Sequence, residues 1–195
     1  MVDLTRVTNF NRTQAELEEF WLVTICVAGK NGPVQARKVH EFLTGLAGDT
    51  PFDKIRRLIV ADRLLARLQE VKMGQYNRVQ KAFTQSLLLN LTTATLADLL
   101  AIPGVGGKTA RFFLLHSRAG FEHIVLDTHI LRFLREVGRL RKIPASTPST
   151  ATKYNDIERR ALPVMRRHFP NLTIAEADLK IWVMLSGHKP LDSMD

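Results

Sequence analysis

Apolar residues recur every three or four positions along most of the chain, and this spacing predicts amphipathic helices. The clearest stretch follows Thr50 and has its apolar positions at Ile55, Leu58, Ile59, Leu64, Leu65 and Leu68. Two other segments open on the Thr-x-x-Glu pattern that is typical of a capping box, in which a helix start is closed by reciprocal hydrogen bonds. These pairs are Thr13 with Glu16 and Thr173 with Glu176.

About nine helices are expected from such start signals and apolar periods, beginning near residues 13, 33, 50, 76, 95, 106, 128, 152 and 173. No segment alternates apolar and polar residues over the length of a strand. Ile124–Leu126 is apolar and mostly β-branched, but it is too short to change the class. The pattern therefore predicts an all-α fold.

The charge of the chain favours a polyanionic partner. Lys and Arg number 28 and Asp and Glu 19, so the formal net charge is 28 − 19 = +9. Such an excess is typical of proteins that bind nucleic acid, although a basic protein with a solvated surface has the same composition. The 195 residues suit one domain or two small lobes.

Membrane and metal sites are not expected. The longest apolar stretch is too short to span a bilayer, and the N-terminus lacks the apolar core of a signal peptide. We therefore expect an intracellular protein, in the cytoplasm or nucleoid if it is bacterial or archaeal. The single cysteine, Cys26, excludes a multi-cysteine metal or iron–sulfur site, and His116, His123 and His188 show no metal-ligand spacing.

A glycine-rich turn is the most informative local feature. Residues 102–110 read IPGVGGKTA and join two helical segments. The glycines permit positive φ and close approach of another backbone, and the N–H groups that open the second helix have no partner within it. Such a helix start suits a phosphate, with Val105 inserted into the core. An ordinary turn between two helices is the alternative.

The phosphate-binding loop of NTPases is excluded, although GVGGKT resembles its end. That motif requires glycine five positions before Gly107, and the chain has Ile102 there. No apolar strand precedes the turn either.

An amine and a carboxylate accompany the turn. Lys108 lies at the start of the second helical segment, and Asp127 follows nineteen positions later inside VLDTHILRFL. Together with a phosphate site, this pair indicates chemistry on a nucleic acid. Lys108 could instead only bind phosphate, and Asp127 could be the N-cap of the next helix. Capping and catalysis are compatible roles for one carboxylate.

IPGVGGKTA followed by VLDTHIL resembles the helix-hairpin-helix DNA glycosylases, the superfamily of endonuclease III and the 8-oxoguanine glycosylases. Weaker similarity extends to Gly74–Asn77, to Ile181–Gly187 and to the loop 28–31. The resemblance implies one all-α unit, 1–195, of two helical lobes with the active-site cleft between them. Residues 30–130, with the hairpin at 95–118, would form the central lobe, and residues 1–29 plus 131–195 the second.

The resemblance also implies roles for single residues. Lys108 would be the nucleophile and Asp127 the essential carboxylate, and the N–H groups around the hairpin turn would hold a DNA phosphate. Gln75 would wedge into the space that the extruded base leaves, and Lys30 or Asn31 would contact the opposite strand. His129 could donate to a phosphate or only pack. The expected DNA-binding residues are Gly104, Val105, Gly106, Gly107, Thr109, Lys30, Asn31, Gln75, Tyr76 and His129.

The function that the resemblance implies is a DNA glycosylase with AP-lyase activity, acting as a monomer on duplex DNA that contains a damaged base. Endonuclease III carries a four-cysteine iron–sulfur cluster, whereas this chain has one cysteine, so no cofactor is expected. The missing cluster favours an oxidised purine such as 8-oxoguanine. A glycosylase for oxidised pyrimidines such as thymine glycol, and a non-catalytic helix-hairpin-helix DNA-binding module, remain alternatives.

Several side chains keep two interpretations. Arg111, Arg118, Arg132 and Arg135 lie near the motif and are candidate phosphate contacts or solvated charges. Trp21 and Trp182 lie on apolar helical faces and are expected in the core. The sequence does not indicate which aromatic ring would stack on a damaged base.

Overall fold

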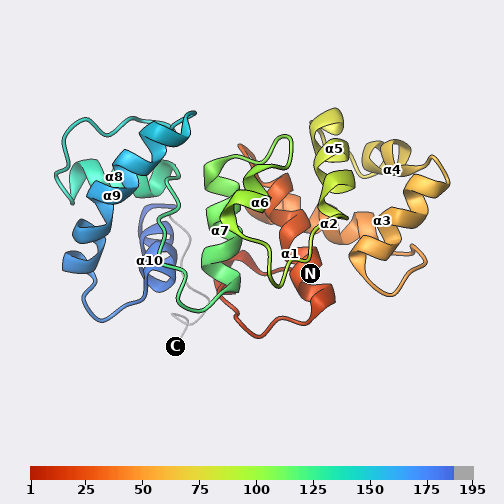
Figure 1. Cartoon of the computed structure of the whole chain (residues 1–195), viewed down its shortest axis with the longest axis horizontal. Coiled ribbons are helices and arrows are strands. Elements are labelled where there is room, and N and C mark those ends of the chain that lie inside the picture. Colours follow the sequence, from red (N-terminus) through yellow and green to blue (C-terminus); the bar gives the residue numbers. More distant parts are fainter. Residues whose placement is uncertain (187–195) are drawn as a thin grey trace.

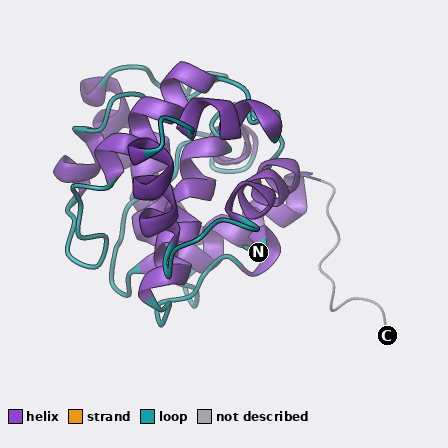
Figure 2. Cartoon of the chain, turned by 90° about the vertical axis from the view of Figure 1, so that its right-hand side faces the viewer, coloured by secondary structure: helices purple, strands orange, loops and turns teal. Residues whose placement is uncertain are grey.

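The computed structural model describes residues 1–186, which form ten α-helices, one short 3-10 helix and no strand (Figure 2). The prediction of an all-α fold is therefore confirmed for this part of the chain. Gly187, His188 and the rest of 187–195 lie outside the described residues. The elements are η1 (Leu4–Arg6), α1 (Gln14–Cys26), α2 (Gly32–Leu43), α3 (Pro51–Val60), α4 (Leu64–Glu70), α5 (Tyr76–Ser86), α6 (Leu96–Leu100), α7 (Gly107–Ser117), α8 (Thr128–Glu136), α9 (Ala151–His168) and α10 (Ile174–Ser186).

The helices begin where the capping signals predicted. The Thr13 hydroxyl accepts from the Glu16 N–H, and the Glu16 carboxylate accepts from the Thr13 N–H, which completes a capping box at α1. Thr173 and Glu176 make the same pair of bonds at α10. These contacts are local in sequence, so the pattern alone sufficed to find them.

One predicted helix is divided in two. Asp62 takes a positive φ of 51°, and the Arg63 N–H donates to the Leu58 carbonyl at 2.8 Å, which ends α3 and reorients the chain into α4. Leu58 and Leu64 are both buried in the same apolar cluster. Because both helices present apolar residues to one core, the helical spacing of apolar residues continues from α3 into α4. The sequence pattern therefore does not show the break between them.

Two apolar clusters form two lobes. The first gathers buried residues of α1 to α7, including Trp21, Phe83 and Phe113. The second gathers those of α8 to α10 and the segment before α8, including Leu126 and Ile181. Figure 1 shows α8, α9 and α10 at one end of the molecule, α2 to α5 at the other, and α1, α6 and α7 between them. The two-lobed all-α architecture agrees with the expectation.

Helix α1 lies in the first lobe, which differs from the expected grouping of residues 1–29 with 131–195. It packs against α2, α7, α3 and α5, and the Trp21 indole N–H donates to the Ser86 hydroxyl at 2.7 Å. The physical reason is that α1 is apolar around most of its circumference, since Phe20 to Cys26 are all buried. A helix of this kind needs neighbours on every side. It is therefore packed among α2, α3, α5 and α7 as part of the first lobe.

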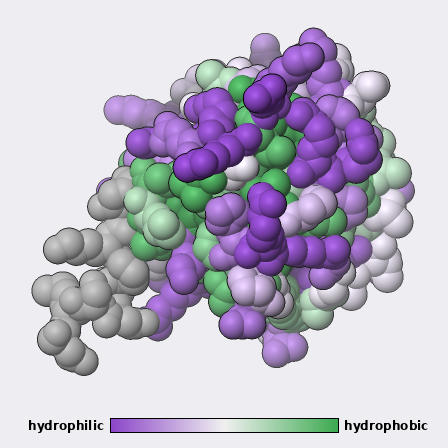
Figure 3. Space-filling view, turned by 90° about the vertical axis from the view of Figure 1, so that its left-hand side faces the viewer, coloured by the Kyte–Doolittle hydropathy of each residue, from purple (hydrophilic) through white to green (hydrophobic). Residues whose placement is uncertain are grey.

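The outer face of the second lobe is largely hydrophilic. Figure 3 shows hydrophilic side chains gathered over this end of the molecule, with apolar ones between them. Helix α9 supplies exposed cations here, among them Arg159, Arg166 and Arg167.

Within the described part of the chain, no helix has both the length and the apolar character needed to cross a membrane.

The lone thiol provides a test of the first core. Cys26 is fully buried, and burial raises the pKa of its thiol to about 12. At pH 8 the thiol is therefore neutral and shielded, and we expect the folded protein to leave Ellman's reagent unreacted while the protein unfolded in guanidinium reacts completely. Rapid stoichiometric labelling of the native protein would contradict this packing of α1.

Candidate active site

The hairpin has the predicted turn. Gly104 adopts a φ of +84°, and a Cβ there would lie 2.5 Å from the Arg78 Cγ, so only glycine fits without displacement. Val105 is buried in the first core, as expected. Its N–H donates to the Ile102 carbonyl at 3.1 Å, so this N–H serves the turn and is taken out of the expected phosphate site.

The start of α7 is open to a ligand. Gly106 is the N-cap and has no side chain to close the helix, and Gly107, Lys108 and Thr109 form the first turn. N–H groups in this position have no intrahelical acceptor and carry the positive end of the helix dipole. The hairpin therefore offers an anion site at Gly106, Gly107 and Lys108.

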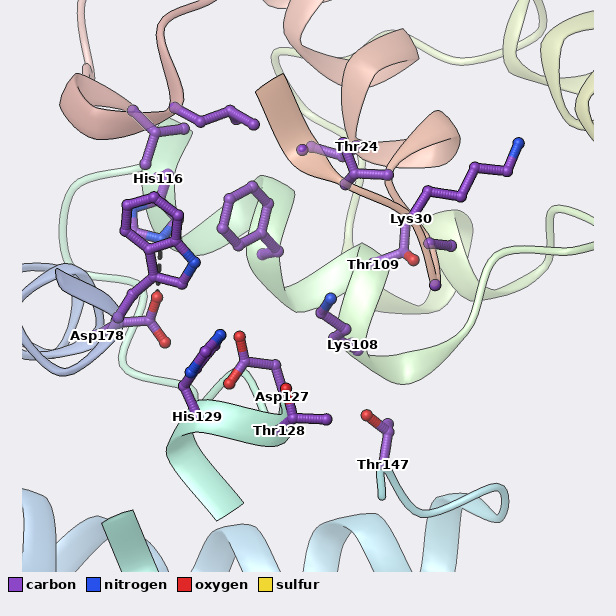
Figure 4. A pocket seen from close by; sticks show the side chains of 18 of the residues that line it. Thr24, Lys30, Lys108, Thr109, His116, Asp127, Thr128, His129, Thr147 and Asp178 are labelled. Carbon is purple, nitrogen blue, oxygen red and sulfur yellow. Dashed lines mark hydrogen bonds and ion pairs between the residues drawn. The ribbon is translucent and has the colours of Figure 1, made fainter. Parts of the chain in front are cut away.

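A cavity of about 530 Å³ lies beside this helix start (Figure 4). It is bounded by η1, the α1–α2 loop, α7, the start of α8 and α10, so both lobes contribute to it. The polar side chains that line it are Thr24, Lys30, Asn31, Lys108, Thr109, His116, Asp127, Thr128, His129, Thr147 and Asp178. The fold thus brings the two predicted catalytic residues into one space.

Lys108 and Asp127 face this cavity from α7 and α8 (Figure 4). Asp127 is the N-cap of α8, and its Oδ1 accepts from the Ile130 N–H at 2.8 Å, so the capping role is confirmed. Lys108 makes no hydrogen bond or ion pair with any residue of the described chain. The amine is therefore available to a molecule in the cavity, and one carboxylate oxygen of Asp127 remains for it too.

The segment that delivers Asp127 is held from α9. The Tyr154 hydroxyl donates to the Ile124 carbonyl at 2.9 Å and accepts from the Leu126 N–H at 2.8 Å. The Thr147 hydroxyl donates to the Leu126 carbonyl at 2.7 Å. These bonds satisfy the buried backbone of an extended segment that has no neighbouring strand. They also set the point at which α8 begins.

A buried ion pair joins α7 to the same part of α9. The Arg111 Nε and Nη2 each donate to the Glu158 carboxylate at 3.0 Å, and Glu158 Oε1 also accepts from the Ile124 N–H at 2.8 Å. The Arg111 guanidinium lies 4.2 Å from the centre of the Tyr154 ring. Gly107 permits this approach, because a Cβ there would lie 3.1 Å from Tyr154 Cδ2.

The four candidate phosphate arginines each bond to another part of the protein. Burial removes Arg111 from the surface, whereas phosphate contact by the other three stays a prediction. Arg111 is buried in the ion pair with Glu158. Arg118 donates to the Leu91 carbonyl. Arg132 donates to the Glu136 carboxylate, and Arg135 to the Pro144 carbonyl. Their proximity to the motif in sequence gave no information on these distant acceptors.

A buried histidine–carboxylate pair was missed by the sequence analysis. His116 is fully buried; its Nε2 lies 3.3 Å from Asp178 Oδ2, and its Nδ1 lies 2.8 Å from the Thr8 hydroxyl. Burial raises the pKa of Asp178, the hydrogen bond with His116 opposes this, and the charges of Asp127 and Lys108 also act on it. Asp178 therefore belongs electrostatically to the same site. Its distance from His116 in sequence, across two helices, leaves no local signal.

Two aromatic side chains line the cavity. Phe113 is buried in the first core, whereas its neighbour Phe112 is half-buried and faces the cavity from α7. Trp182 also lines it from α10, so its expected place in the core is wrong, while Trp21 is buried as expected. Helical periodicity marks an inward face, and it cannot distinguish a packed core from a cavity wall.

The comparisons with known proteins bear on this geometry. A sequence-family model of the helix-hairpin-helix motif matches residues 87–115. No curated protein sequence matches the chain. Among solved structures, the chain is similar to the Methanocaldococcus jannaschii 8-oxoguanine glycosylase/lyase, crystallised with a 15mer DNA containing 8-oxoguanine. That similarity has a TM-score of 0.68 at 22% sequence identity and covers 95% of this chain and 88% of the other.

The chain therefore shares its overall fold with that protein, and residues 87–115 carry a helix-hairpin-helix motif. Within this fold, the remaining predicted DNA-binding residues fall into two groups. Thr109, His129, Lys30 and Asn31 line the cavity. Gln75 and Tyr76 do not line it and lie instead at the start of α5.

The two residues of the α1–α2 loop, Lys30 and Asn31, already bond within the protein. The Lys30 ammonium donates to the Met73 carbonyl at 2.7 Å, and burial lowers its pKa. The Asn31 side chain caps α2 by accepting from the Val34 N–H. Each therefore holds its loop, and contact with a second DNA strand stays a prediction. No cluster of three or more His, Cys, Asp or Glu side chains within residues 1–186 could hold a metal ion.

The ion pair between Arg111 and Glu158, which joins the two lobes, can be tested by measuring stability. Arg111→Met leaves the Glu158 carboxylate buried without its cation, and we expect a loss of about 3–5 kcal/mol in the free energy of unfolding, measured in urea. Arg159→Met is the matched control, because Arg159 pairs with Asp156 on the surface with 77% of its side chain exposed. That change should cost less than about 1 kcal/mol. Equal, small losses in both variants would contradict the role assigned to Arg111.

Proposed function

We propose that the protein is a DNA glycosylase with AP-lyase activity that removes an oxidised base, with 8-oxoguanine preferred, from duplex DNA. The observation that carries this proposal is that Lys108 and Asp127 face one cavity between two lobes, directly beside an open helix start. The similarity in fold to an 8-oxoguanine glycosylase/lyase supports the choice of reaction and of an oxidised purine. The chemistry requires no metal ion.

DNA would dock on the hairpin. The N–H groups of Gly106, Gly107 and Lys108 would bind a backbone phosphate next to the lesion. The damaged nucleotide must leave the stack, because C1′ is unreachable inside a duplex. The cavity of about 530 Å³ is within the size range of sites for small molecules, and Phe112 and Trp182 offer rings to the extruded base.

The two catalytic residues would then act in sequence. As the N-glycosidic bond breaks, its electron pair goes to the base and positive charge develops on the sugar, where the Asp127 carboxylate stabilises it. The Lys108 amine, which must be deprotonated to react, bonds to C1′. The C1′–O4′ bond then opens, a proton of the amine passes to O4′, and a Schiff base results. Loss of a C2′ proton then expels the 3′ phosphate, which nicks the strand. Schiff-base formation explains why the amine must have no partner in the protein.

The first test is borohydride trapping with duplexes that carry 8-oxoguanine, thymine glycol, uracil or an abasic site. A covalent adduct is expected with 8-oxoguanine and with the abasic site, and Lys108→Gln should abolish it while DNA binding persists. Lys81→Gln is the control, since Lys81 is an exposed lysine of α5 away from the cavity.

The alternatives predict other results in the same experiment. An adduct with thymine glycol instead of 8-oxoguanine would indicate an oxidised-pyrimidine glycosylase. Salt-sensitive DNA binding without any adduct would indicate a non-catalytic module. Trapping by Lys108→Gln at the wild-type level would remove Lys108 as the nucleophile.

The second test separates the two roles of Asp127. Asn is as good an N-cap as Asp, so Asp127→Asn keeps the bond from the Ile130 N–H and loses only the charge. We expect single-turnover base release to slow by about 100-fold or more, with an unchanged melting temperature. Asp127→Ala, which removes cap and charge, should also lower stability. Full activity of the Asn variant would exclude charge stabilisation by Asp127.

A further inference from the structure

Three segments of the chain meet at one side chain, Arg78 of α5. Its Nε donates to the Gln75 side-chain oxygen at 2.7 Å, its Nη1 to the Gly104 carbonyl at 3.1 Å, and its Nη2 to the Ile25 carbonyl at 2.9 Å. The acceptors belong to the start of α5, to the hairpin turn and to the end of α1. The planar guanidinium can serve three directions at once, which a lysine ammonium on a flexible stem does less well.

The contact with the hairpin is close. A Cβ at Gly104 would lie 2.5 Å from the Arg78 Cγ and 3.2 Å from its Cδ, so the turn is in van der Waals contact with the arginine stem as well as bonded to its head. Gly104 adopts a positive φ of 84° at this point. Arg78 therefore fixes the position of the turn, and with it the position of the start of α7.

Gln75 itself is held in an unusual state. Its backbone has a φ of 51° and a ψ of 39°, in the left-handed region that residues other than Gly, Asn and Asp rarely adopt. Its side chain makes no capping bond to α5, and it is exposed. The bond from Arg78 engages its amide oxygen, and the exposed side chain keeps its amide nitrogen as a donor. Strain of this kind persists only where neighbours enforce it.

We propose that Arg78 is a positioning residue that orients Gln75 as the wedge and ties it to the phosphate-binding hairpin. The inference rests on the proposed function, because it assumes that the surface of Gln75 and the hairpin receives DNA. Arg78 would act through Gln75 and not on the substrate. Binding of a phosphate at α7 and insertion of Gln75 into the duplex would then be coupled through one rigid side chain.

A double-mutant cycle tests this coupling. The variants are Arg78→Met, Gln75→Ala and the two together, with Lys81→Met as a control that removes a positive charge from the same helix. Each is titrated with a duplex that carries a tetrahydrofuran abasic analogue opposite 2-aminopurine, whose fluorescence reports unstacking. This readout needs no base release. The wild-type fluorescence response and the wild-type glycosylase activity are therefore separate results, and inactive wild-type protein would contradict only the proposed function.

We expect Arg78→Met and Gln75→Ala each to weaken formation of the fluorescent complex by roughly tenfold, and Lys81→Met to have a much smaller effect. The loss in the double variant should be clearly smaller than the sum of the two single losses, because Arg78 acts largely through Gln75 and retains only its contact with the hairpin when Gln75 is replaced. Additive losses would overturn the proposal, as would a wild-type response in Arg78→Met. If Arg78→Met does not fold, Arg78→Lys replaces it in the cycle, and its smaller loss must again be reduced in the Gln75→Ala background.

Discussion

The buried ion pair between Arg111 and Glu158 is the constraint on which the site depends. Arg111 lies three residues after Lys108 on α7, and Glu158 also binds the Ile124 N–H in the segment that leads to Asp127. The amine and the carboxylate are therefore placed by one set of contacts. Buried pairs of this kind add little to stability, but breaking one is costly, and displacements near 1 Å are enough to impair catalysis.

Two arginines secure the hairpin from opposite sides. Arg111 binds the second lobe through Glu158, and Arg78 binds the turn through the Gly104 carbonyl. Glycine favours each approach: a Cβ at Gly104 would lie 2.5 Å from Arg78 Cγ, and a Cβ at Gly107 would be in tight contact with Tyr154, at 3.1 Å. The glycines of IPGVGGKTA thus serve packing on both sides of the turn, as well as the opening toward a phosphate.

Sequence reasoning succeeded where the cause of a feature is local. Caps such as Thr13 and Asp127 and the hairpin turn depend on residues three or four positions apart, so their pattern is legible in one chain. It failed where partners are distant. Glu158 is 47 positions from Arg111, and an apolar position such as Trp182 has the same helical period whether it faces a core or a cavity. The placement of α1 likewise depends on which helices surround it.

The most direct test of Lys108 as the nucleophile is to identify the residue that carries the sugar after borohydride reduction. The adduct formed with an 8-oxoguanine duplex is digested with nuclease and protease, and the modified peptide is sequenced by mass spectrometry. If Lys108 is the nucleophile, the deoxyribose remnant is attached to its side-chain nitrogen. Attachment to another lysine or to the N-terminal amine would contradict this role of Lys108.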